Sequence, residues 1–110
     1  MFKEFEEIIV VVEENDCNEK GLTTAFETIE CENKRVAYII TNLKIFQMLR
    51  QNMRNCLDVN TVPKLLNLGY RGTLWGADIW IKNDIKNLMC LQEDSFKMKK
   101  LFPKVLQFQS

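Results

Sequence analysis

The sequence predicts one α+β domain, with a small mixed sheet and about three helices packed on it. Two observations support this fold class: unbroken β-branched runs indicate buried strands, and apolar residues three and four positions apart indicate amphipathic helices. The two patterns alternate along the chain without a linker or an internal repeat. A length of 110 residues is typical of one domain, so we expect residues 1–110 to form a single unit.

The first strand and the first helix are predicted near the N-terminus. Ile8–Val12 is β-branched throughout, so Glu6–Glu14 is predicted to be a strand, and the unbroken apolar run indicates burial on both faces. Asn15–Asn18 offers turn and N-cap side chains. The helix expected from Glu19 to about Cys31 has one apolar stripe, formed by Leu22, Ala25, Phe26 and Ile29.

A second strand and helix follow. Val36–Ile40 is predicted to be a buried strand, and Asn42 can cap the helix after it. The residues at helical spacing there are Leu43, Phe46, Arg50 and Met53, with Leu49 beside them. Asp58–Thr61 is a further cap signal, and Pro63 is tolerated in the first turn of a short helix.

The rest of the chain is predicted to contain two more strands. Gly69 ends the short helix, whose apolar side is formed by Val62, Leu65 and Leu66. Thr73–Lys82 alternates as one strand, with Trp75, Ala77, Ile79 and Ile81 on one face and Leu74, Gly76, Asp78 and Trp80 on the other. Leu88–Gln92 is expected to be a last central strand, and Pro103 to end a helical segment.

The charges are unevenly distributed although the net charge is zero. Residues 1–34 hold ten acids and three lysines, a charge of −7, and residues 35–110 carry the opposite charge of +7. This polarity favours contact between the two parts, within one chain or between neighbouring copies. The alternative is that each set of charges is a solvated face.

The residue types exclude most catalytic chemistry. The chain contains no histidine, which rules out a Ser-His or Cys-His nucleophile, and its four glycines fit no phosphate-binding loop. The carboxylates of Asp78 and Asp84 match no hydrolytic or metal-binding spacing. We expect reduced thiols rather than a disulfide or a metal site at the four separated cysteines, Cys17, Cys31, Cys56 and Cys90. We therefore predict no enzyme, cofactor or metal.

The sequence also predicts no membrane association. No apolar run approaches the roughly 20 residues that span a bilayer. Ile8–Val12 is too short, and too acidic at its edges, for a signal peptide. We therefore expect a cytoplasmic protein, or a virion-associated one if it belongs to a prophage.

One glycine-rich motif stands out, from Leu68 to Ile79. Gly69 is expected to close a helix, Gly72 to allow a tight turn into the strand, and Gly76 to leave a gap within that strand. The motif residues singled out are Gly69, Gly72, Leu74, Trp75, Gly76, Ala77 and Asp78.

This motif, Gly-x-x-Gly-x-Leu-Trp-Gly-Ala-Asp-Ile, resembles a segment near the C-terminal part of the major capsid proteins of tailed bacteriophages. The preceding strand and asparagine, Val36 to Asn42, and the two helices after them look similar in order, so the resemblance covers about Leu22 to Ile81. It implies the central domain of the capsid fold. The family's N-terminal arm, long hairpin loop and spine helix do not fit into 110 residues. The resemblance thus implies a domesticated or degenerate relative, and puts shell formation in doubt.

The predicted function is a non-enzymatic structural or protein-interaction module that associates with itself or another protein. Trp75 is expected in the core, whereas Trp80, which shares a face with Asp78, is either core or a contact anchor. Asp78 itself is expected to cap a turn or pair with a base such as Arg71. The alternative function is a small nucleic-acid-binding accessory protein that uses Lys97, Lys99 and Lys100, unless these form only a solvated helix face.

Overall fold

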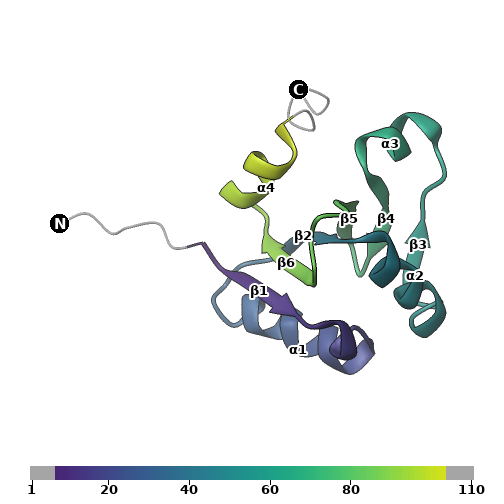
Figure 1. The fold of residues 1–110 in the computed structure, drawn as a ribbon. Helices are drawn as coiled ribbons and strands as arrows, with labels where there is room; N and C mark the ends of the chain where they lie inside the picture. The colour runs from purple at the N-terminus through teal and green to yellow at the C-terminus, as the bar shows by residue number, and fades with distance from the viewer. Residues whose placement is uncertain (1–6, 104–110) are drawn as a thin grey trace.

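A six-stranded mixed sheet organises the protein, as the computed structural model of residues 7–103 shows (Figure 1). Its strand order is β1-β6-β2-β5-β4-β3; β2 and β5 are parallel, and every other neighbouring pair is antiparallel. The strands are β1 (Ile9–Val12), β2 (Val36–Thr41), β3 (Leu57–Val59), β4 (Tyr70–Leu74), β5 (Ala77–Ile81) and β6 (Leu88–Gln92). The helices of the described chain are α1 (Glu19–Glu30), α2 (Leu43–Asn52), α3 (Pro63–Leu68) and α4 (Phe96–Leu101), with one 3-10 turn at Glu14–Asp16. The α+β class and the mixed sheet are confirmed.

Both long helices begin at the predicted asparagine caps. The side chain of Asn18 accepts a hydrogen bond from the Gly21 amide, and that of Asn42 accepts one from the Ile45 amide. The predicted stripe of α1 is buried. The predicted stripe of α2 is partly wrong: Phe46, Leu49 and Met53 are buried as predicted, but Leu43 and Arg50 are exposed. Ile45, which was not predicted, is buried as well.

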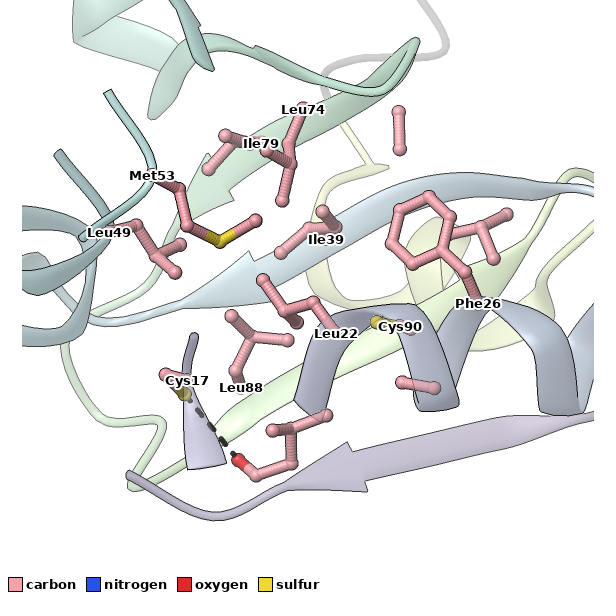
Figure 2. Close-up of a cluster of buried hydrophobic side chains, with 14 of the residues drawn as sticks. Cys17, Leu22, Phe26, Ile39, Leu49, Met53, Leu74, Ile79, Leu88 and Cys90 are labelled. Carbon is pink, nitrogen blue, oxygen red and sulfur yellow. Dashed lines mark hydrogen bonds between the residues drawn. The ribbon is translucent and has the colours of Figure 1, made fainter. Parts of the chain in front are cut away.

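The first hydrophobic layer lies between the sheet and helices α1 and α2. Figure 2 shows Leu22 and Phe26 of α1 gathered with Ile39, Leu88 and Cys90 of the central strands. Leu49, Met53, Leu74 and Ile79 extend the same cluster toward α2 and the β4–β5 hairpin. This layer holds most of the fully buried side chains.

The second layer is smaller and lies on the opposite face, because neighbouring strand residues such as Ile39 and Ile40 point to opposite sides. Its buried residues are Ile40, Trp80, Met89, Leu91 and Met98. Helix α4 covers part of this face. Ser95 caps α4 by accepting a hydrogen bond from the Met98 amide, and Glu7 accepts hydrogen bonds from the Ser95 hydroxyl and the Lys97 amide.

The expectation that the first strand is buried on both faces is wrong. In the sheet of the described residues, β1 is an edge strand that pairs only with β6. Its Val10 and Val12 side chains join the first layer, whereas Ile9 and Val11 are 37% and 55% exposed on the other side. An apolar run alone does not show whether the second face of a strand is covered.

The segment predicted as one strand from Thr73 to Lys82 is in fact a hairpin of β4 and β5, joined by Trp75 and Gly76. The short strand β3 was not predicted, since Asp58–Thr61 has the composition of a cap. Helix α3 begins at Pro63 with no side-chain cap and ends at Gly69, whose φ of 102° is left-handed, as predicted. The prediction for β6 is also confirmed: all five residues are buried between β1 and β2.

Candidate interaction site

The turn of the β4–β5 hairpin contains a bulky residue in an unfavourable conformation. Trp75 has a φ of 51° and Gly76 a φ of 83°, between the paired residues Leu74 and Ala77. Two positive φ angles in a two-residue hairpin loop define a type I′ turn, which favours asparagine, aspartate or glycine. A left-handed conformation costs a residue with a Cβ about 1–2 kcal/mol. The turn geometry therefore does not explain why a tryptophan is present.

The Trp75 ring stands at the end of the first layer rather than inside it. It is 41% exposed and meets the Phe26 ring edge-on, with the two centroids 5.2 Å apart. A shallow hollow of about 300 Å³ beside the two rings is lined by Thr23, Phe26, Glu27, Glu30 and Trp75. At the tip of the hairpin, the two aromatic rings thus border a solvent-exposed hollow next to α1.

The rim of this hollow is acidic. Glu27 and Glu30 lie one helical turn apart on α1, and neither forms an ion pair within residues 7–103. An aromatic face next to carboxylates suits a lysine or arginine side chain, because the ring attracts a cation and the carboxylates pair with it. We define Trp75, Phe26, Glu27 and Glu30 as the hairpin-tip site.

The other tryptophan does not serve as a surface anchor. Trp80 is only 4% exposed, and its ring packs between Tyr70 and Phe102, at centroid distances of 5.1 and 5.4 Å. Its indole Nε1 is buried with no hydrogen-bond partner in the described part of the chain. The prediction that Trp75 lies in the core is therefore wrong, and of the two alternatives for Trp80 the structure shows the core position rather than an exposed anchor.

Asp78 pairs with a tyrosine rather than with a base. The Tyr70 hydroxyl donates to Asp78 Oδ1 at 3.4 Å, whereas the guanidinium of Arg71 donates to the backbone carbonyls of Leu66 and Tyr70. Burial raises the pKa of Asp78, although the Tyr70 hydrogen bond and the charge of Arg35 oppose this change. The expected pairing of Asp78 with Arg71 is thus wrong.

Two motif glycines have other roles than expected. Gly72 lies inside β4 with a φ of 131°, and a Cβ there would overlap the carbonyl oxygen of Asp58 in β3. Gly76 lies in the turn, where an added Cβ would meet no atom within 4 Å. The close backbone approach expected at Gly76 therefore occurs at Gly72. Leu74 and Ala77 are fully buried on either side of the turn.

The predicted lysines lie on the opposite face of the sheet from Trp75. Lys97, Lys99 and Lys100 belong to the short helix α4, and the Lys99 ammonium lies 5.3 Å from the centroid of the exposed Phe96 ring. Lys99 and Lys100 are exposed, and Lys97 is half-buried. The structure does not bring these lysines together with the motif residues.

The thiols are free, and two of them are buried. Burial is the main cause that raises the pKa of Cys17 to about 11 and that of Cys90 to about 12. Such thiols are poor nucleophiles at neutral pH. Within residues 7–103 no group of three histidine, cysteine or acidic side chains is arranged to hold a metal ion, and no helix is long and apolar enough to cross a bilayer.

No protein-family model, no curated protein and no solved structure shows significant similarity to this chain. The resemblance of Gly69–Ile79 to phage capsid proteins therefore stays a prediction.

Proposed function

We propose that this chain is a non-enzymatic structural module that acts by binding protein, either another copy of itself or a different protein, through the hairpin-tip site. The observation that carries the proposal is Trp75: a large aromatic residue in a left-handed turn position, half exposed beside a hollow. Strained residues are retained mainly where they serve a function, and exposed aromatic residues are frequent binding hot spots.

The partner surface that fits this site is basic. Glu27 and Glu30 belong to the acidic first third of the chain, whose charge is −7, and the remaining residues carry +7. A second copy therefore offers one source of basic side chains, and a basic segment of another protein offers another. The resemblance to a capsid domain supports a structural role in assembly, and we retain it as part of this proposal.

The proposal is tested with variants that keep the turn intact. Trp75→Asn suits the type I′ turn but removes the ring, and Glu27→Gln with Glu30→Gln removes the charges. Glu19→Gln, at the exposed start of the same helix, is the matched control. Self-association is measured by sedimentation at low and high salt. Binding of a labelled arginine-rich peptide is followed by fluorescence anisotropy, a readout that also works in the Trp75→Asn variant.

The expected result is self-association or peptide binding that weakens with salt and is lost in the Trp75 and Glu27/Glu30 variants but not in the control. A protein that stays monomeric under all conditions and does not bind the basic peptide would refute the proposal. Equal binding by all variants would also refute the role of this site.

A second candidate function rests on the aromatic and basic surface of α4. Phe96 is exposed, Lys99 lies over its ring, and Lys100 is exposed on the same short helix. Aromatic and basic side chains together can contact single-stranded nucleic acid. This function requires binding that falls steeply as salt rises, with a smaller salt slope when Lys97, Lys99 and Lys100 are replaced by alanine. Absence of binding at low salt eliminates it.

A further inference from the structure

The second edge of the sheet has open backbone groups. Within residues 7–103, β3 pairs only with β4. The Asn60 amide donates a hydrogen bond to the Arg71 carbonyl of the β4 strand. In an antiparallel pair, every second residue directs its backbone N–H and C=O groups toward the partner strand. Asp58 therefore also faces β4, whereas Leu57 and Val59 direct these groups away from it. In residues 7–103, no hydrogen bond satisfies these outward groups.

A groove runs beside this open edge. It has a volume of about 640 Å³ and is lined by Leu57 and Val59 of β3 and by Gln47, Arg50, Gln51 and Arg54 of α2 and the turn after it. Arg50 and Arg54 are exposed and form no ion pair with any described residue. Val59 is 41% exposed. Among the described residues, the groove therefore combines an unpaired strand edge, two apolar lining side chains and two arginines that form no ion pair.

We propose that this β3–α2 groove binds an extended acidic segment of a partner protein, which adds to the sheet as a strand next to β3. The segment's backbone would pair with the outward groups of Leu57 and Val59. Because strand side chains alternate, every second side chain would face α2, where carboxylates can form bidentate pairs with Arg50 and Arg54. This surface is separate from the hairpin-tip site and takes a partner of the opposite charge.

The same features favour a peptide over a nucleic acid. In residues 7–103, two cations line the groove, together with the apolar side chains of Leu57 and Val59. The exposed carboxylate of Asp58 lies between these two residues on β3. A polyanion would gain little from so few phosphate contacts and would be repelled by Asp58. In a strand that alternates acidic and apolar residues, the carboxylates face Arg50 and Arg54, and the uncharged apolar side chains lie on the face of Asp58, which does not repel them.

The test uses a labelled peptide of about eight residues, in which glutamate alternates with valine, and follows its binding by fluorescence anisotropy. Arg50→Gln with Arg54→Gln should weaken binding by about tenfold or more, because charge-assisted hydrogen bonds are lost. Lys86→Gln with Lys100→Gln removes the same charge from exposed positions outside the groove and should leave binding unchanged. Trp75→Asn should also leave it unchanged, which separates this inference from the proposed function.

Strand addition is tested separately from charge. Val59→Pro removes an amide that points away from β4, so it should spare the sheet and abolish binding. A peptide with alternate N-methylated amides tests the same hydrogen bonds without altering the protein, and it should bind at least about tenfold more weakly. Undetectable binding of the peptide to the wild-type protein would overturn the inference. So would unchanged binding of the N-methylated peptide, or equal binding of a single-stranded oligonucleotide.

Discussion

The tip and the body of the β4–β5 hairpin each contain one tryptophan and one glycine, yet the two pairs have opposite roles. At the tip, Trp75 is half exposed and Gly76 is surrounded by open space. In the body, Trp80 is buried in the second layer, and Gly72 leaves room for the carbonyl oxygen of Asp58. The comparison shows that position relative to the turn, rather than residue type, decides whether a side chain stabilises the fold or remains available for binding.

The largest effect is expected from Trp80→Ala. The ring is almost fully buried between Tyr70 and Phe102, so its removal should lower the free energy of unfolding by about 3–5 kcal/mol. Urea unfolding measures this change. Trp80→Phe keeps an aromatic ring and removes the indole N–H that lacks a partner, so it should cost clearly less. A loss below about 1 kcal/mol for Trp80→Ala would show that the second layer contributes little to stability.

The two glycines provide the next contrast. Gly72→Ala should cost about 3 kcal/mol, because the new Cβ overlaps backbone of β3 and the φ of 131° is strained for any L-residue. Gly76→Ala, its matched control at the tip, meets no neighbouring atom and should cost only about 1–2 kcal/mol. Thermal unfolding of both variants checks the order. Equal losses would contradict the close contact between β3 and β4 at Gly72.

Trp75→Asn should change stability by less than about 1 kcal/mol. The loss of the edge-on contact with Phe26 costs about 0.5–1.5 kcal/mol, and the asparagine offsets it because it tolerates the left-handed turn conformation. The same urea experiment applies. A loss comparable to that of Trp80→Ala would place Trp75 among the core residues and remove the main argument for a binding role.

The smallest effect concerns Asp78, next to Tyr70 in the body of the hairpin. Burial raises the pKa of Asp78, so the folded protein keeps this proton to a higher pH than the unfolded chain does. The contribution of Asp78 to stability therefore falls as the pH rises from the ordinary carboxyl range through the raised pKa. Asp78→Asn should remove this decline and be slightly more stable than wild type at neutral pH but not in acid. Parallel pH profiles for the two proteins would contradict this assignment.

Much of the fold could be predicted because its signals are local. Asn18 and Asn42 cap the helices that follow them, and the stripe of α1 faces the core, since cap chemistry and helical periodicity depend on a few neighbouring residues. β3 was missed because three residues with a cap-like composition form a strand only when β4 is beside them. Exposure of one face of β1 depends on its place at the edge.

The candidate sites were predicted less well than the fold. The pair Trp75-Gly76 is compatible either with the middle of one strand or with a turn between two strands. The alternating side-chain pattern from Thr73 to Lys82 favoured one continuous strand. Gly76 after a bulky residue was the signal for a hairpin, but the type I′ turn usually has asparagine or aspartate at the first position. The β3–α2 groove could not be predicted from the sequence. Arg50 and Arg54 form a candidate binding site only because the fold places an unpaired strand beside them.

The sequence by itself determined the α+β class, the helix caps, the left-handed end of α3 at Gly69 and the absence of histidine chemistry, since each follows from residue types and short spacings. The tertiary structure alone decided which tryptophan is buried, which strands lie at the edges, and which charges remain unpaired. These properties depend on the strand order β1-β6-β2-β5-β4-β3, which joins segments far apart in the chain. Long-range pairing of this kind leaves no pattern in any one segment, because each strand's exposure is set by its neighbours in the sheet.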